Sequence, residues 1–506
     1  MLSVTLKEES PVPIYLQIAE QIEAAIAGGR IRGQQRLPTT RGLAKELGIN
    51  RLTVARAYAE LSRRGLIATR VGSGTWATPP DAGGGRGSGA AGAGALRWGA
   101  LLARTPERAV HSGAASRVWP QSETDAISFA WVFPDPALFP VEALHRAVSR
   151  VLRKDGGRIL GYGPPAGHAP LRRMIARDLN ARGAMVSEEE ILVTNGSQQG
   201  IDLVARALLD PGDRVLVEDP TYVGAVQVFH SYGADLEGIP MDGEGAIVER
   251  AAIAAARPRT KLMYVMPDFQ NPTSRSMSLK RREAIVSLAA SQGMVILEDD
   301  FGGALRYEGN ELPPLKALDR SGSVVYLSTF GKKLFPGMRI GWLAAPGPLA
   351  ERLIRLKAIA DYSTSLLLQA AAFEFCAAGD LDRHLAKVVP RYRERRDAML
   401  AAMKDHFPPE ATWTRPDGGL VVWVTLPAGV SAGEIAALAE NRSVLVGRGD
   451  LFHLGHRTRE NLRLSFSQEA PQRIARGVRI LGEVIKERIA ARPPARIGPE
   501  SPLPLI

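Results

Sequence analysis

Apolar residues near the start of the chain recur with the period of an α-helix. Four isoleucines stand four residues apart, at Ile14, Ile18, Ile22 and Ile26. This spacing predicts an amphipathic helix over 13–27. Two more helices are expected at 39–47 and 50–64, each followed by a glycine. Runs at 66–69 and 75–77 flank a glycine-rich turn and predict a hairpin, so the pattern is three helices and a two-stranded wing.

From residue 127 onward, short apolar strands alternate with helical stretches. The clearest strand candidates are 191–193, 215–217, 262–265 and 295–297. This alternation predicts an α/β domain with a largely parallel sheet. A smaller C-terminal α/β part is expected to begin near Pro390.

Composition divides the chain into parts. Residues 81–95, DAGGGRGSGAAGAGA, are of low complexity, and the segment from Arg492 is rich in proline. The expected parts are a head at 1–78, a flexible Gly/Ala-rich linker at 79–126, an α/β body at 127–490 and a disordered tail at 491–506.

The bulk numbers are those of a globular protein, with 45% hydrophobic and 23% charged residues among 506. No apolar run reaches the ~18 residues of a membrane span, and no signal-peptide pattern opens the chain. Cys376 is the only cysteine, which excludes an intramolecular disulfide and a cysteine metal cluster. We therefore expect a cytoplasmic protein without a metal site.

The net charge of +11 is unevenly distributed. Residues 36–76 carry eight basic and two acidic side chains, an excess of +6. Such an excess favours a polyanionic partner, although a solvated basic face is the simpler interpretation of charge alone.

Three helices followed by a wing form a winged helix-turn-helix, whose third helix can enter the major groove of DNA. The residues expected to contact double-stranded DNA are Arg41, Asn50, Arg51, Thr53, Arg56, Arg70, Gly72 and Ser73. Asn50 also stands at the N-cap position of the third helix.

Residues 35–76 resemble the head of GntR-family bacterial regulators. The matching motifs are Leu-Pro-x-x-Arg, Leu-Gly-x-x-Arg-x-Thr-Val and a Gly-Ser-Gly wing. Asn50 replaces a common Ser, and Thr39-Thr40 replace a usual Ser pair, but these side chains can also cap or donate. The resemblance implies an operator DNA partner, and a helix-turn-helix used only for protein contact is the alternative.

The body carries a distinctive lysine segment, TFGKKLFPGMRIGW, at 329–342. Lys332 follows an apolar strand at 324–327, and a Pro-Gly turn and Arg339 come next. This layout suits an amine that forms a Schiff base with an aldehyde cofactor, beside an arginine that holds a phosphate. Lys333 is the neighbouring alternative.

From about residue 127 to residue 486 the chain resembles fold type I aminotransferases, which bind pyridoxal 5′-phosphate. Head and body together resemble MocR-type transcriptional regulators. The resemblance implies a large and a small C-terminal subdomain, pyridoxal 5′-phosphate as cofactor, an amino acid or amine effector, and a homodimer.

The resemblance also assigns roles to individual residues. Lys332 would be the catalytic, Schiff-base lysine. Its cofactor would be held by Asp299 at the pyridine nitrogen, Asn271 at the phenolic oxygen, Tyr222 on the ring face, and a phosphate group of Gly196, Ser197, Gln198, Thr329 and Arg339. Asp300 is the alternative to Asp299. Arg463 would bind the carboxylate of the substrate or effector, and Tyr162 would reach the phosphate of the other subunit.

Three positions depart from the pattern. Phe301 stands where relatives have Tyr, Ser274 replaces Gly, and Gly331 replaces Ser. A Tyr would donate a hydrogen bond to the phenolic oxygen. Our hypothesis is therefore that the imine in this protein holds its proton to higher pH than in a Phe301→Tyr variant.

Three functions fit these features. The first is a regulator that senses an amino compound by exchange with Lys332. The second is a working aminotransferase whose head tethers or autoregulates it. The third is a DNA-binding protein with a purely structural body, against which the retained Lys332, Asp299, Asn271 and Arg339 argue.

Overall fold

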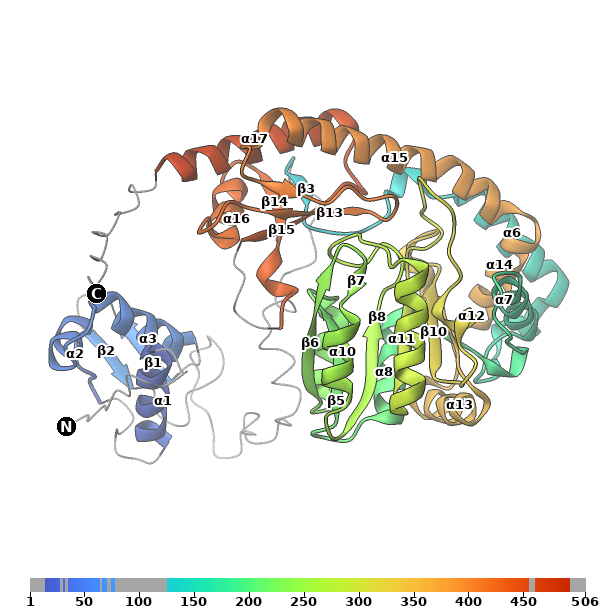
Figure 1. Cartoon of the computed structure of the whole chain (residues 1–506), viewed down its shortest axis with the longest axis horizontal. Helices are drawn as coiled ribbons and strands as arrows, with labels where there is room; N and C mark the ends of the chain where they lie inside the picture. Colours follow the sequence, from blue (N-terminus) through green and yellow to red (C-terminus); the bar gives the residue numbers. More distant parts are fainter. Residues whose placement is uncertain are drawn as a thin grey trace, which may run out of the picture. The chain divides into compact units, whose positions relative to one another are not determined.

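The computed structural model describes residues 14–27, 31, 35–63, 66–70, 74–77, 125–454 and 460–491. The chain divides into two compact units, residues 1–104 and 105–506, which we treat separately as the head and the body (Figure 1). The described part of the head ends at Ala77 and that of the body begins at Asp125. Most of the expected linker and tail, 79–124 and 492–506, therefore lies outside the described residues.

The head is a winged helix-turn-helix, as predicted. Its elements are α1 (Ile14–Ala27), α2 (Thr40–Glu46), α3 (Arg51–Arg63), β1 (Ile67–Arg70) and β2 (Gly74–Ala77), and the two strands pair antiparallel. Ile18, Ile22 and Ile26 are buried against α2 and α3, whereas Ile14, at the start of α1, is 40% exposed.

Local hydrogen bonds explain where the head helices begin. The Thr39 hydroxyl accepts from the Gly42 N–H at 3.0 Å, so threonine performs the capping role expected of it. The Asn50 carbonyl accepts from the Thr53 N–H at 3.0 Å in the first turn of α3. The Tyr58 hydroxyl donates to the Pro38 carbonyl at 2.8 Å and ties α3 to the segment before α2.

The body is built on an eight-stranded sheet with the largely parallel character that was predicted. In spatial order its strands are β4 (Ile191–Thr194), β11 (Gly341–Ala344), β10 (Val324–Thr329), β9 (Val295–Asp300), β8 (Thr260–Val265), β5 (Arg214–Asp219), β6 (Asp235–Asp242) and β7 (Gly245–Ala246). The five strands from β10 to β6 run parallel, and the antiparallel pairings lie toward the two edges.

Helices cover both faces of this sheet, because its strands are apolar on both sides. The helices of this large subdomain are α6 (Val141–Asp155), α7 (Ala169–Ala181), α8 (Ser197–Leu208), α9 (Val223–Ser231), α10 (Val248–Ala255), α11 (Leu279–Gln292), α12 (Leu315–Leu318), α13 (Gly347–Asp361) and α14 (Leu366–Ala377). Within β10, Val325 and Leu327 face the cluster with α8, α9 and α13, while Val324 and Tyr326 face the opposite clusters.

The small subdomain has a five-stranded sheet in the order β12 (Thr412–Trp413), β13 (Val421–Thr425), β15 (Asn461–Ser465), β14 (Val444–Arg448) and β3 (Ile127–Phe129). Its helices are α15 (Asp380–His406), α16 (Ala432–Glu440) and α17 (Pro471–Ala490), and α15 and α17 pack over the sheet (Figure 1). Short 3-10 turns complete the body at Pro136–Leu138, Gly156–Leu160, Glu188–Glu190, Pro336–Met338 and Gly449–Leu451.

The small C-terminal part was expected to begin near Pro390, which lies inside helix α15. Helix α15 continues through Pro390, although proline lacks the N–H that a helix interior uses. Val388 and Tyr392 on either side are buried in the core of the small subdomain, so tertiary packing maintains the helix across the proline. In the described part of the chain, no helix is long and apolar enough to cross a membrane.

Candidate functional site

A cavity of about 250 Å³ opens in the body beside the carboxyl ends of β9 and β10. Its lining residues are Trp131, Val132, Phe133, Ser197, Tyr222, Met266, Asn271, Asp299, Phe301, Thr329, Lys332 and Arg463. Seven of these are residues that the sequence singled out as site candidates. The carboxyl ends of parallel strands are where open α/β sheets bind ligands.

The Lys332 amine lies at the wall of this cavity. Its Nζ donates to the Val132 carbonyl at 2.5 Å and lies 5.6 Å from the centre of the Phe133 ring. Burial, with the positive charges of Arg463 and Arg339, lowers the pKa of Lys332 to about 8. An appreciable fraction of the amine is therefore neutral and nucleophilic near neutral pH.

The neighbouring Lys333 points elsewhere. Its ammonium lies 5.0 Å from the centre of the Trp342 ring, and its side chain lines a different cavity together with Asp300. The geometry thus favours Lys332 as the reactive lysine.

Asp299 and Asp300 are separated in the same way, because successive residues of a strand point to opposite faces. The Asp299 carboxylate is buried at the cavity that Lys332 also lines, and its Oδ2 accepts from the Tyr264 hydroxyl at 2.6 Å. Its Oδ1 is buried without a hydrogen-bond partner. Burial raises the pKa of Asp299 to about 7, so this oxygen favours a positively charged N–H donor.

Asp300 has a complete set of structural partners. Its carboxylate accepts from Arg182 at 3.1 Å, from the Tyr326 hydroxyl at 2.5 Å and from the Gly303 N–H at 2.9 Å. The Arg182 charge holds the pKa of Asp300 below its usual range despite burial. Asp300 therefore supports the fold, and Asp299 is the carboxylate with an oxygen available to the cavity.

Arg463, on β15 of the small subdomain, faces the cavity from the opposite side. Its Nη1 donates to Asn271 Oδ1 at 3.2 Å and its Nη2 to the Ala130 carbonyl at 2.6 Å, while Nε is buried without a partner. The Phe452 ring lies 4.7 Å from the guanidinium carbon. Burial lowers the pKa of Arg463 to about 10, which leaves it charged and poorly compensated, as a carboxylate receptor should be.

An anion site lies where α8 begins. Gly196 precedes the helix at φ 83°, and a Cβ there would come within 2.7 Å of Arg339 Nη2. The same Nη2 donates to the Asn195 carbonyl at 2.8 Å. The helix N-terminus and a guanidinium therefore meet at one point, which is an arrangement that binds phosphate.

Two further candidates near this point have structural partners. The Gln198 side chain donates to the Gly224 carbonyl at 2.9 Å and accepts from the Tyr222 hydroxyl at 3.1 Å, so it orients the Tyr222 ring. The Thr329 hydroxyl donates to the Ile340 carbonyl at 3.0 Å and accepts from the Gly331 N–H at 2.9 Å. Its proton is thus directed to the backbone, and Thr329 braces the lysine turn.

Tyr162 does not line the cavity of its own chain. Its side chain is 90% exposed and lies 5.7 Å from the Tyr362 ring. A role at the phosphate would require a second copy of the chain.

In the head, Arg41, Asn50, Arg51 and Arg56 are exposed and Thr53 is partly exposed. The Arg56 guanidinium also lies 4.3 Å from the centre of the Tyr15 ring. Arg70 ends β1, but Gly72 and Ser73 lie outside the described residues.

The three unusual positions have distinct surroundings. Phe301 lines the cavity, so a hydroxyl is missing from that wall. Ser274 adopts φ 53°, and its hydroxyl donates to the Val421 carbonyl at 2.7 Å, which joins the large subdomain to the small sheet. A Cβ at Gly331 would lie 3.2 Å from Thr329 Oγ1, a close approach that the present glycine avoids.

Sequence reasoning missed several residues of the site. Trp131 and Phe133 stack with centroids 5.7 Å apart, and Val132 between them supplies the acceptor for Lys332. Tyr264 was also missed, although it lies on β8, next to the strand that carries Asp299. The available signals were an aromatic pair just after the first apolar run of the body and a tyrosine within an apolar strand.

Comparison with known proteins gives two family matches. The family described as aminotransferase class I and II matches residues 133–481, and the gntR family of bacterial regulatory proteins matches residues 14–76.

Individual relatives fall into two groups. The uncharacterized HTH-type transcriptional regulator YisV of Bacillus subtilis is 32% identical over 94% of this chain and 97% of its own length. The probable rhizopine catabolism regulatory protein MocR of Rhizobium meliloti is 33% identical over 82% of each chain. Among solved structures, an alpha-aminoadipate aminotransferase of Thermus thermophilus, complexed with N-(5′-phosphopyridoxyl)-L-leucine, is 34% identical with a TM-score of 0.72. This match covers 78% of the present chain and 100% of the enzyme.

Proposed function

We propose that this chain is a transcriptional regulator controlled by pyridoxal 5′-phosphate and an amino compound. The chain belongs to the MocR-type regulators, with a gntR-family head and a class I and II aminotransferase domain. The observation that carries this proposal is the extent of the matches. A regulator aligns with 94% of the chain, head included, whereas the aminotransferase structure covers 78%. The head implies double-stranded DNA as a partner, and a bacterial regulator of this kind would act in the cytoplasm.

The cavity fits pyridoxal 5′-phosphate on three points of its own chemistry. Lys332 offers an amine with a lowered pKa, Asp299 offers a buried unpartnered oxygen, and Arg339 with the start of α8 offers an anion site. When bound, this cofactor supplies an aldehyde that condenses with amines and a ring that withdraws electrons. Tyr222 would cover a ring face, and Asn271 would donate to the ring oxygen.

The protein side chains then perform separate tasks around an incoming amino compound. Arg463 would hold a carboxylate through its guanidinium, whose acceptors in the described part of the chain are one carbonyl and one amide oxygen. Lys332 would accept or carry a proton at Nζ, because the pKa of its free amine, about 8, is close to neutral pH. Trp131 and Phe133 supply an apolar wall that excludes water.

Control of DNA binding requires that the amino compound bind one arrangement of the protein more tightly than another. Arg463 belongs to the small subdomain and Lys332 to the large one, so a ligand that engages both favours their approach. In our proposal this closure alters how the heads are presented to DNA. The exposed Tyr162 supports a homodimer in which it completes the partner's phosphate site.

Catalytic transamination is the second candidate function. The joint presence of Lys332, Asp299 and Arg463 around one cavity supports it, and the Thermus thermophilus enzyme shares the fold. Phe301 argues for slower turnover, since that wall lacks a hydroxyl donor.

A spectroscopic experiment tests the proposal. Purified full-length protein should gain a visible absorption band with pyridoxal 5′-phosphate, and Lys332→Ala should not. An amino compound should change the band. Addition of a keto acid should not lead to repeated turnover of the amino compound. Sustained turnover of an amino donor with a keto acid would instead identify an aminotransferase.

A further inference from the structure

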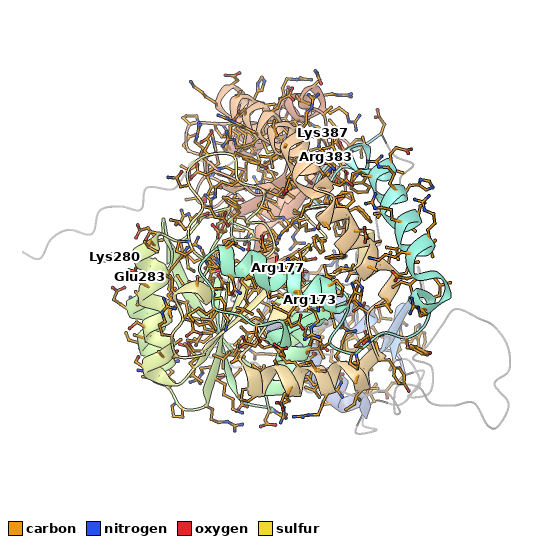
Figure 2. All side chains as sticks on the ribbon, turned by 90° about the vertical axis from the view of Figure 1, so that its right-hand side faces the viewer. Arg173, Arg177, Lys280, Glu283, Arg383 and Lys387 are labelled. Carbon is orange, nitrogen blue, oxygen red and sulfur yellow. The ribbon has the colours of Figure 1, made fainter. Side chains whose placement is uncertain are left out.

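A second cavity, of about 380 Å³, lies behind the turn that carries the reactive lysine. It is bounded by α7, α15, the end of β9 and the start of β11, and includes Arg182, Asp300, Lys333 and Trp342 in its wall. Figure 2 shows α7 and α15 on one face of the body, with Arg177 and Arg383 labelled on them. Its volume falls within the range of small-molecule sites.

This cavity and the cofactor cavity share two short segments of chain. Asp299 and Lys332 line one, while their neighbours Asp300 and Lys333 line the other. A ligand in the second cavity would therefore contact the same strand end and the same turn that hold the cofactor site, but from the opposite side.

Some polar groups of the second cavity already satisfy one another. Arg182 pairs with Asp300 at 3.1 Å and with Glu311 at 2.7 Å, and the Tyr326 hydroxyl completes the cluster. These charges are compensated, so they call for no ligand.

Two donors in the inner wall are not satisfied. The Lys333 ammonium forms no hydrogen bond or ion pair with the described residues. It lies 5.0 Å from the centre of the Trp342 ring, and its charge also acts on Asp300 and on the Cys376 thiol. The Trp342 indole N–H is buried without an acceptor, on a side chain that is only 4% exposed. A buried N–H and an ammonium that lie close together favour an acceptor such as a carboxylate.

Two carboxylates of the same cavity lack a positively charged partner in the described part of the chain. Asp178 on α7 and Asp382 on α15 line the same cavity and are exposed, and neither carboxylate is paired within the described part of the chain. Both act on the Cys376 thiol, where their charges help burial raise its pKa, so they lie near the same point. Together they offer a site for an ammonium group.

The remaining wall is apolar. Met174, Phe330, Leu381 and Leu385 line it. A third cavity, of about 350 Å³, adjoins it and shares Met174 and Cys376 with it. There is therefore room for an extended apolar group beyond the charged positions.

We propose that this cavity binds a free α-amino acid with an apolar side chain, as a site separate from the cofactor cavity. Its carboxylate lies between Lys333 and the Trp342 N–H, its ammonium faces Asp178 and Asp382, and its side chain lies toward Met174. A ligand with only a carboxylate would face the two acids unpaired, and one with only an amine would leave Lys333 and Trp342 unsatisfied.

Titration calorimetry on full-length Arg463→Ala protein tests this, because that variant removes the carboxylate receptor of the cofactor cavity. The probes are L-leucine, which carries an ammonium and a carboxylate, isoamylamine, which carries the ammonium alone, and isocaproate, which carries the carboxylate alone. We expect saturable binding of L-leucine and at least about tenfold weaker binding of the other two.

Variants locate the site. Lys333→Met in the same background should weaken L-leucine binding at least about tenfold, and Trp342→Phe should weaken it less, since one neutral donor is lost. The control is Lys387→Met, an exposed lysine of α15 on the same face that does not line the cavity (Figure 2). An unchanged thermal unfolding midpoint shows that each variant is folded.

Cys376 gives a second, local measurement, because it is the only cysteine of the chain and lines the cavity. L-Leucine should slow its modification by N-ethylmaleimide in the Arg463→Ala protein but not after Lys333→Met. The proposal is overturned if L-leucine gives no heat of binding, or if it binds Lys333→Met as tightly as the parent.

Discussion

At the residue scale, burial determines which groups of the body are reactive. Lys332 loses hydration at the cavity wall and becomes a weaker base, whereas Asp299 loses hydration and becomes a weaker acid. Both changes raise the fraction of the neutral form near pH 7. The cavity therefore suits a ligand that brings its own charges, namely a phosphate and a ring that can carry a positive charge.

The first prediction concerns the pH dependence of cofactor uptake. Only the neutral Lys332 amine attacks an aldehyde, and its fraction rises with pH until the pKa of about 8 is passed. The second-order rate constant of pyridoxal 5′-phosphate uptake, followed by visible absorbance, should therefore rise up to about pH 8 and then level off. A rate that still climbs toward the ordinary lysine pKa of about 10.4 would contradict the assignment.

The second prediction concerns Phe301. A tyrosine at this wall would donate a hydrogen bond to the ring oxygen of the cofactor, whose negative form it stabilises. The visible band of the cofactor-loaded protein should titrate at a pH higher than that of Phe301→Tyr, by about one unit or more. Equal midpoints in the two titrations would refute this role for the missing hydroxyl.

Much of the site could be predicted from single residues, because its short motifs contain several residues with chemically reactive or charged side chains. The sequence motifs favoured Lys332 over Lys333 and Asp299 over Asp300, but they gave no physical reason that separates the two members of each pair. The structure separates each pair, since the members of each line different cavities. Trp131 and Phe133 were not predicted, because no local sequence pattern connects them to Lys332, which lies about two hundred residues later in the chain.

At the element scale, the start of α8 and the lysine turn form one unit. Gly196 lets the backbone pass close to Arg339, and Gly341 lies against the backbone of the same segment, where a Cβ would meet Ser197 N at 2.8 Å. The site therefore depends on glycines that permit close approach as well as on charged side chains.

The third prediction is that Gly196→Ala weakens binding of the cofactor phosphate. Its Cβ would displace the Arg339 guanidinium, and its φ of 83° strains a non-glycine residue. The dissociation constant for pyridoxal 5′-phosphate should rise at least about tenfold in an absorbance titration.

The matched control is Gly293→Ala. Gly293 also has a positive φ, of 62°, but nothing lies within 4 Å of its Cβ position. It should lose about 1 kcal/mol of folding stability and keep its cofactor affinity. Equal losses of affinity in both variants would mean that backbone strain, and not the displaced arginine, is responsible.

Strands and helices with strong local patterns were predictable, and pairings between distant segments were not. All five predicted strands of the large sheet exist, because each is a continuous apolar run. By contrast, β3 pairs with β14 at residues 444–446, and α15 passes through Pro390. Both features are decided by tertiary packing, which no short window of sequence contains.

At the scale of the whole molecule, a basic head and a cofactor-type body are joined in one chain. The head carries over half of the net charge of +11 within residues 36–76. Its fold and family were predictable, since the motif spacings are local.

The fourth prediction compares two arginines of the head. Arg41 lies on α2 and is expected at a phosphate, whereas Arg51 opens α3 and is expected at a base edge. Arg41→Ala should weaken binding to all DNA sequences and reduce the salt slope by about 1. Arg51→Ala should cost about 1–3 kcal/mol mainly on the preferred sequence, measured by anisotropy against selected and scrambled DNA. Identical effects of both variants on both DNAs would contradict these placements.

The most direct test of the central claim is the DNA affinity of the cofactor-loaded full-length protein, measured by anisotropy on a selected operator with and without an amino compound that changes the visible band. We predict that the compound shifts the dissociation constant by about 5–150-fold in either direction, and that Lys332→Ala shows no shift. An unchanged dissociation constant, at saturating compound and with the cofactor demonstrably bound, would contradict the account.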